Sequence, residues 1–181
     1  MRVVSGKAKG TKLSAVPGTT TRPILDRVKT ALFDILRPSL SGKVVLDLFA
    51  GSGGVGIEAL SQGAGRCVFI DVEKSAVKTI RANLEATHLS EWGEVRQTEA
   101  LLFLRKENRV FDYIYVAPPQ YKNLWQEALR ALAEKPSLLA PDGQIICQID
   151  PLEYEPLLLE PFSEFLQRKY GNTLLVFFQH K

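Results

Sequence analysis

The chain has 181 residues and a formal net charge of +3, with 45% hydrophobic and 24% charged residues. This length and composition predict a single domain, residues 1–181, with enough apolar area to fold without a metal or a disulfide. They exclude wholesale disorder, and we expect no membrane span, no signal peptide, no metal site and a cytoplasmic location, because long apolar runs and clustered cysteines or histidines are absent.

The spacing of apolar and turn-forming residues predicts the elements in chain order. Residues 1–16 are typical of a short strand or hairpin, Pro17-Gly18 begins a loop, and a helix is expected to start at Pro23 and end at Pro38. Strands are expected at 43–48, 67–70, 94–97, 110–116 and 144–149, and helices at 53–62, 73–86, 99–105 and 122–134. Residues 164–170 and 173–178 flank Gly171-Asn172 and predict a hairpin.

Strands that alternate with helices form right-handed βαβ units. The sequence therefore predicts an α/β fold with a mostly parallel sheet, helices on both faces, an antiparallel C-terminal hairpin and a small N-terminal strand/helix extension. In such sheets a ligand binds beyond the carboxyl ends of the strands, where the strand order reverses. The motifs described next follow the expected strands at this edge.

A glycine-rich segment follows the expected strand at residues 43–48. Gly51, Gly53 and Gly56 match the pattern G-x-G-x-x-G between a strand and a helix, and Asp71 ends the next strand. A carboxylate at that place accepts hydrogen bonds from both hydroxyls of an adenosine ribose. The pattern predicts a cofactor that contains adenosine, and a glycine turn without a ligand is the alternative.

Asp47 distinguishes two such cofactors. The pyrophosphate of a nicotinamide dinucleotide binds at the glycine loop and the helix N-terminus, where a nearby carboxylate repels it. S-adenosyl-L-methionine has no phosphate and carries an ammonium and a sulfonium, which a carboxylate attracts. We therefore favour S-adenosyl-L-methionine, and the residues expected to bind it are Asp47, Phe49, Gly51, Ser52, Gly53, Asp71, Glu99 and Ala100.

Glu99 and Ala100 follow the third expected strand of the core. Glu99 can accept a hydrogen bond from an adenine amine while Ala100 presents its backbone N–H. Thr98 and Glu99 can equally cap the following helix, and the sequence leaves both interpretations open.

A second motif, Ala117-Pro118-Pro119-Gln120-Tyr121, follows the expected strand at residues 110–116. Together with Asp47-x-Phe49-x-Gly51-x-Gly53, this element resembles amino-group methyltransferases with a (D/N)PP(Y/F) motif. Residues 1–6, 22–33 and 47–60 extend the similarity over nearly the full chain to the RsmD-type family. The members of that family are class I methyltransferases that methylate the guanine N2 amine of 16S ribosomal RNA in the small subunit.

The resemblance implies a Rossmann-like class I methyltransferase fold, S-adenosyl-L-methionine as cofactor, ribosomal RNA or the small subunit as partner, and a monomer. It implies that the catalytic residues are Ala117, Pro118, Pro119, Gln120 and Tyr121. In this motif a side-chain oxygen and a backbone carbonyl accept hydrogen bonds from the target amine, and an aromatic ring stacks on a flipped base.

The chain departs from the family pattern at two places in this motif. The family has Asp or Asn where this chain has Ala117, and Tyr121 lies one place later than the expected aromatic residue. Loss of the side-chain acceptor predicts a rate about ten- to a hundredfold lower, unless another group replaces it. Gln120 is a candidate for that replacement.

Basic residues are concentrated near the N-terminus. Residues 1–43 contain nine lysines and arginines and two acids, whereas the remaining residues contain 14 bases and 18 acids. This asymmetry indicates a polyanionic partner, although a solvated basic surface gives the same pattern. We expect residues 1–42 to contact RNA and residues 43–181 to form the catalytic core, with RNA contacts from Arg2, Lys7, Lys9, Lys12, Arg22, Asp26, Arg27 and Lys29.

Three other functions fit parts of the sequence. Ala117 is compatible with a relative that binds S-adenosyl-L-methionine or RNA without catalysis. An amino methyltransferase that acts on another RNA, on DNA or on a protein amide shares the same motifs. A nicotinamide oxidoreductase shares only the glycine loop and Asp71.

Overall fold

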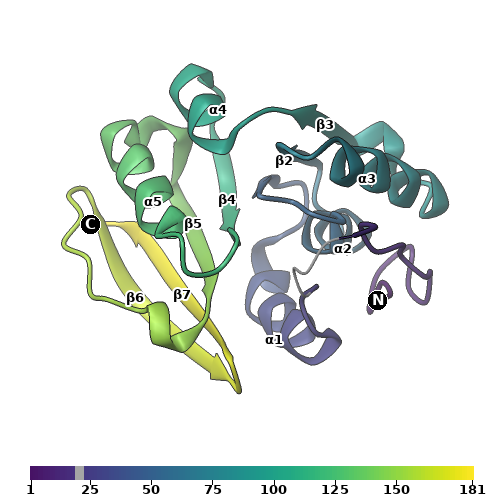
Figure 1. Cartoon of the computed structure of the whole chain (residues 1–181), viewed down its shortest axis with the longest axis horizontal. Helices are drawn as coiled ribbons and strands as arrows, with labels where there is room; N and C mark the ends of the chain where they lie inside the picture. The colour runs from purple at the N-terminus through teal and green to yellow at the C-terminus, as the bar shows by residue number, and fades with distance from the viewer. Residues whose placement is uncertain (19–22) are drawn as a thin grey trace.

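The computed structural model describes residues 1–18 and 23–181. Within these residues, seven strands form one sheet in the order β3-β2-β1-β4-β5-β7-β6 (Figure 1). The strands are β1 (Val44–Leu48), β2 (Arg66–Asp71), β3 (Gly93–Gln97), β4 (Phe111–Val116), β5 (Leu139–Ile149), β6 (Phe162–Tyr170) and β7 (Thr173–His180). Strands β1 to β5 pair in parallel, and β7 pairs antiparallel with both β5 and β6. The predicted mostly parallel sheet with an antiparallel C-terminal hairpin is confirmed.

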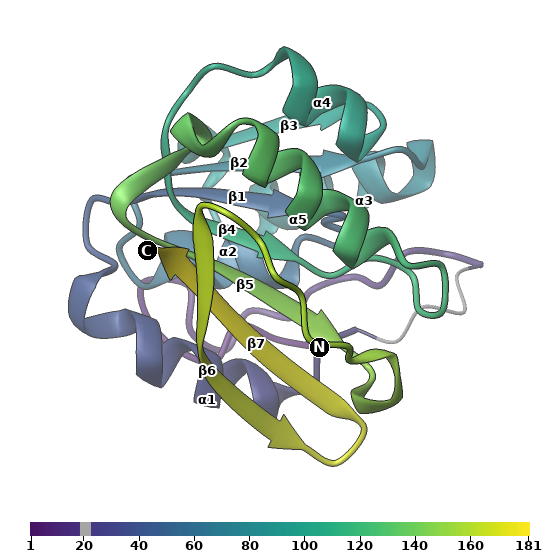
Figure 2. The same cartoon turned by 90° about the vertical axis from the view of Figure 1, so that its left-hand side faces the viewer.

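Helices cover both faces of the sheet. They are α1 (Asp26–Leu36), α2 (Gly54–Ser61), α3 (Lys74–Ala86), α4 (Ala100–Lys106) and α5 (Leu124–Glu134), and short 3₁₀ helices span Arg37–Ser39, Ser90–Trp92, Pro136–Leu138 and Pro151–Glu153. Buried residues of α1, α2 and α3 share one apolar cluster on one face, and those of α4 and α5 share a second cluster on the other. Figure 2 shows α4 and α5 in front of the strands.

The central strands contribute to both clusters because successive side chains point to opposite faces. In β1, Val45 belongs to the first cluster, whereas Leu46 and Leu48 belong to the second. Strands buried on both faces are apolar along most of their length, which is why the sequence predicts them well. Asp47 interrupts this pattern, and it is buried on the face that packs against α2.

Two predicted boundaries are wrong. Helix α1 begins at Asp26 instead of Pro23, because Leu25 is still extended. Strand β5 begins at Leu139 instead of residue 144, because its pairing with β4 is irregular between Phe111 and Tyr113 and accommodates the turn-forming residues 141–143. The other core strands and helices, and the two hairpin strands, begin and end within two residues of the predicted positions.

A buried ion pair holds the N-terminal extension, the part of the chain before residue 43, against the core. Lys29 of α1 and Glu58 of α2 are both fully buried, and their charged atoms lie 3.2 Å apart. Glu58 also accepts hydrogen bonds from the backbone N–H groups of Val4 and Ser5, and the Lys29 ammonium donates to the carbonyl oxygen of Arg2. This position corrects the expectation that Lys29 contacts RNA, since its charge is used inside the protein.

Replacing Lys29 tests this interaction. Lys29→Met leaves the Glu58 carboxylate buried without its counterion, and we expect a loss of about 3–5 kcal/mol in the free energy of unfolding. Adding Glu58→Gln, which removes the charge and keeps an acceptor, is expected to recover part of that loss. Urea unfolding measures both, with Arg2→Ala at the exposed Arg2–Asp26 pair as a control that changes stability by less than about 1 kcal/mol. A similar small loss for Lys29→Met would contradict the interpretation.

Candidate functional site

The strand order reverses between β1 and β4, and this reversal brings the two sequence motifs together. The parallel register places Leu48 beside Val116 at the carboxyl ends of these strands. The glycine loop therefore leaves the sheet next to the Pro118-Pro119 segment, and the backbone N–H of Ala117 donates to the carbonyl oxygen of Leu48 at 3.5 Å. Reversal points of this kind are the usual ligand sites of open α/β sheets.

The glycine loop makes a sharp turn into α2. Phe49, Gly51 and Gly53 have φ values of 69°, 56° and 80°, and Gly53 is the N-cap of the helix. A Cβ atom at Gly51 would meet no atom within 4 Å, so the loop leaves open space at this residue. A Cβ at Gly56 would lie 2.3 Å from the Phe69 ring, so this glycine lets α2 pack closely against β2. The loop thus has the shape in which a ligand approaches the backbone closely.

Asp47 lies beneath this loop. Its side chain accepts a hydrogen bond of 3.0 Å from the backbone N–H of Gly56, in the first turn of α2. Burial raises the pKa of the Asp47 carboxyl to about 7, the Gly56 N–H opposes this rise, and the nearby charge of Asp71 adds to it. The structure therefore places Asp47 where it supports the loop from below and brings a titratable negative charge to the site.

Asp71 connects the end of β2 to the same loop. One carboxylate oxygen accepts from the backbone N–H of Gly51 at 2.8 Å, and the other accepts from the N–H of Glu73 at 2.9 Å. Each carboxylate oxygen has a second lone pair, and Asp71 is partly exposed, so it retains the capacity to bind hydroxyl groups.

Asn83 of α3 is a site residue that the sequence analysis missed. Its side-chain amide donates to the carbonyl oxygens of Ser52 and Ser14, and its side-chain oxygen accepts from the N–H of Ser14. Asn83 is buried and thus joins the glycine loop to the N-terminal extension. A polar residue of low helix propensity on the buried side of a predicted helix was the available signal.

Glu99 lies at the start of α4, next to the end of β3. Its side chain does not cap the helix, and it is exposed, whereas Ala100 is buried. The N–H of Thr98 donates to the carbonyl oxygen of Asp71, which places this segment beside the end of β2. The geometry thus gives no support to capping by the Glu99 side chain.

The segment after β4 is fixed by contacts with the end of β5. Ala117 and Pro118 are partly exposed, and Pro119, Gln120 and Tyr121 are exposed. The Tyr121 hydroxyl donates to Asp150 at 2.9 Å, and its backbone N–H donates to Glu153 at 2.6 Å. The bond to Asp150 raises the pKa of Tyr121, so the phenol stays protonated at neutral pH. Asp150 and Glu153, which also form a capping box, are further residues that the sequence analysis missed.

The basic residues expected to contact RNA occupy different environments. Lys9, Lys12 and Arg27 are exposed, and Lys7 lies over the Trp92 ring, 5.4 Å from its centroid. Arg2 pairs with Asp26 at the surface, and Lys29 is buried as described above. Arg22 lies outside the described residues.

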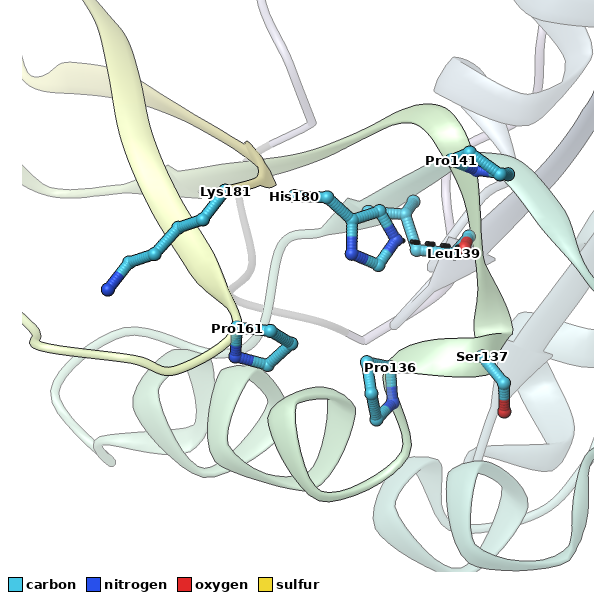
Figure 3. Close-up of a pocket in the computed structure, with 7 residues that line it drawn as sticks. All are labelled: Pro136, Ser137, Leu139, Pro141, Pro161, His180 and Lys181. Carbon is cyan, nitrogen blue, oxygen red and sulfur yellow. Dashed lines mark hydrogen bonds between the residues drawn. The ribbon is translucent and has the colours of Figure 1, made fainter.

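The rest of the described part of the chain gives no competing site of comparable chemistry. Among the described residues, no group of three acidic, histidine or cysteine side chains is placed to hold a metal, and no helix is long and apolar enough to cross a membrane. Figure 3 shows an open surface pocket between Leu139, Pro161 and His180. It lies at the amino end of β5, at the opposite end of this strand from the glycine-loop edge.

Known proteins of this architecture match the chain closely. Residues 1–179 match the family model described as "Conserved hypothetical protein 95". The chain is 41% identical over 153 residues to "Putative rRNA methyltransferase YlbH" of Bacillus subtilis, with 83% of each chain covered. It is 35% identical to "Ribosomal RNA small subunit methyltransferase D" of Haemophilus influenzae, covering 83% of this chain and 79% of the relative.

A solved structure confirms the predicted class of fold. The Escherichia coli protein "Putative methyltransferase yhhF" superposes with a TM-score of 0.89 at 28% identity, covering 100% of this chain and 98% of the other. The fold is therefore the Rossmann-like fold of class I methyltransferases, as the sequence predicts.

The buried Asp47 generates a pH-dependent prediction. Its folded pKa of about 7 exceeds the ordinary value of 3.8, so the folded protein retains a proton between these values that the unfolded chain has lost. Stability therefore falls as pH rises through this window. Asp47→Asn keeps an acceptor for Gly56 and removes the charge. We expect the free energy of unfolding of this variant, minus that of the unmodified protein, to be ~1–3 kcal/mol larger at pH 8 than at pH 5. Urea unfolding at both values measures this, and an equal difference at the two would contradict it.

Proposed function

The chain belongs to the conserved hypothetical protein 95 family, the RsmD-type family, and from this premise we propose that it methylates small-subunit ribosomal RNA with S-adenosyl-L-methionine. The target is the exocyclic N2 amine of a guanine. The observation that carries the proposal is the meeting of the glycine loop and the Pro118-Pro119 segment at the ends of β1 and β4. A cofactor held by the first motif is thereby next to a substrate held by the second.

The residues at the glycine loop fit S-adenosyl-L-methionine. The open space at Gly51 admits a ligand close to the backbone, and Asp71 has lone pairs left for the ribose hydroxyls. The negative charge of Asp71, and that of Asp47 above its pKa of about 7, favour a cationic ligand over a pyrophosphate. Phe49, Ser52 and Gly53 complete the loop, and Glu99 and Ala100 lie beyond Asp71 on the side proposed for adenine. When bound, this cofactor supplies a methyl group on a positively charged sulfur.

The segment after β4 fits a flat base with an amino group. The backbone carbonyls of Ala117 and Pro118 are acceptors for amine hydrogens, and the exposed Tyr121 ring offers a stacking surface. Its hydrogen bonds to Asp150 and Glu153 hold the ring and the backbone in place before the substrate arrives. Such preorganisation accelerates a transfer reaction because the reacting groups are already aligned.

A relative that binds without catalysis is the second candidate. The observation that favours it is Ala117, whose side chain offers no acceptor to the target amine. Transfer to a different amine is distinguished from the main proposal only by the identity of the product, so the assay below has to identify the nucleoside.

The decisive experiment is transfer of labelled methyl groups to small subunits that lack the modification, with naked 16S RNA in parallel. We expect label in the RNA, recovered as N2-methylguanosine after nuclease digestion. Asp71→Ala is expected to weaken binding of S-adenosyl-L-methionine at least about tenfold in calorimetry, because it loses the carboxylate that holds Gly51. Asp142→Ala, at an exposed carboxylate on the bulge of β5, is the matched control and is expected to behave like the unmodified protein.

Three outcomes would revise the proposal. Label in a different nucleoside moves the reaction to another amine. No label on either RNA substrate, from folded protein that binds the cofactor, favours the second candidate. Binding of a nicotinamide dinucleotide without binding of S-adenosyl-L-methionine contradicts both the main proposal and the second candidate.

The exposed bases of the N-terminal extension are proposed to bind phosphates. Replacing Lys9, Lys12 and Arg27 together by alanine is expected to weaken RNA binding and to reduce the slope of log affinity against log salt concentration by about 2–3. The matched control replaces Arg105, Lys106 and Lys169, exposed bases of α4 and β6, and is expected to change the slope by less than 1. Equal changes for the two variants would show that RNA binding is not localised to the extension.

A further inference from the structure

The register of β4 and β5 places a carboxamide beside Ala117. Val116, the last residue of β4, pairs with Cys147, so Ala117 follows directly after the strand where Gln148 continues β5. Ala117 packs against the apolar cluster that contains Tyr115 and Ile146. Since side chains alternate along a strand and Ile146 faces this cluster, Gln148 faces it too. Ala117 and Gln148 are thus neighbours on one face, at the carboxyl ends of their strands.

A buried tyrosine of β4 orients the Gln148 side chain. The hydroxyl group of Tyr115 donates a hydrogen bond to its side-chain oxygen. Tyr115 is buried, and burial together with the nearby charge of Asp47 raises the pKa of its phenol well above the ordinary value. Tyr115 therefore remains a donor at all relevant pH values, and the amide oxygen keeps a second lone pair. Gln148 is itself partly exposed and is the second-last residue of β5, at the edge where the substrate is proposed to bind.

The alternative replacement, Gln120, is placed less favourably. It is exposed beyond the proline pair, and none of its side-chain atoms has a hydrogen bond among the contacts of the described residues. A side chain without such contacts loses rotamer entropy when it binds a substrate, whereas the Gln148 amide is already oriented.

We propose that the Gln148 carboxamide supplies the hydrogen-bond acceptor that Ala117 lacks, and that it binds the amine to be methylated. This inference rests on the proposed function, since it names a residue for that reaction. A carboxamide oxygen on β5 then performs the role that a side chain at position 117 performs from β4. The acceptor then comes from the neighbouring strand β5, so methyl transfer is compatible with alanine at position 117.

The chemistry requires no charge on Gln148. The amine nitrogen donates one N–H to the Gln148 oxygen, which localises its lone pair for attack on the methyl carbon. The new nitrogen–carbon bond forms as the carbon–sulfur bond breaks, and the bonding pair returns to sulfur, which becomes a neutral thioether. The nitrogen then carries a positive charge and loses one proton to water.

A rescue experiment tests the inference. Gln148→Ala is expected to lower kcat about ten- to a hundredfold, with the affinities for S-adenosylhomocysteine and for the RNA changed less than about threefold. Adding Ala117→Asn to Gln148→Ala returns an amide from β4 and is expected to recover at least about tenfold in kcat. Tyr115→Phe, which retains Gln148 and removes only the orienting donor, is a second variant with an expected loss of about three- to tenfold. Gln179→Ala, at an exposed position of β7, is the matched control and is expected to leave kcat unchanged.

The outcomes separate this inference from the proposed function. If the unmodified protein transfers no methyl group to either RNA, both the proposed function and this inference are contradicted. An active protein whose Gln148→Ala variant keeps its kcat, or whose loss appears in Gln120→Ala instead, overturns the inference alone. Failure of Ala117→Asn to recover activity in a variant that still binds S-adenosylhomocysteine also overturns it, because the loss would then be structural.

Discussion

The pairing of β1 with β4 is the constraint on which the site depends. These strands are separated along the chain by two other strands and three α-helices, yet their carboxyl ends lie side by side in the sheet. Because each is a parallel strand buried on both faces, a shift in register would break two apolar clusters together. The positions of the glycine loop and the proline pair are therefore set by the packing of the whole core.

Carboxylates hold the loops of this edge through backbone N–H groups. Asp47 accepts from Gly56, Asp71 accepts from Gly51, and Glu153 accepts from Tyr121. Each bond satisfies a donor that a sharp turn leaves unpaired, so it also provides local stability. The cost is a carboxylate removed from water, because burial is the main cause of the raised pKa of Asp47 and the charge of Asp71 adds to it. Under the proposed function, a cationic cofactor would offset that cost.

The basic residues of the N-terminal extension have different roles, because one is buried in the core and others are exposed on the surface. Lys29 forms a buried ion pair with Glu58, and the backbone N–H groups of residues 4 and 5 donate hydrogen bonds to the same carboxylate. Other bases of the extension, such as Lys9 and Lys12, stay exposed. Asn83 extends the same connection from the extension to Ser52. Asn83 thereby joins the backbone of the extension at Ser14 directly to the glycine loop.

The sequence by itself determined the alternation of strands and helices and the position of the two motifs at the carboxyl ends of their strands, because periodicity and turn chemistry are local properties. It could not determine that Lys29 is buried, since an exposed and a paired lysine give the same helical pattern. Nor could it place Asn83, Asp150 or Gln148, which act on residues more than 25 positions away. The partners of these polar side chains are chosen by strand register and helix packing, and only the tertiary structure decides them.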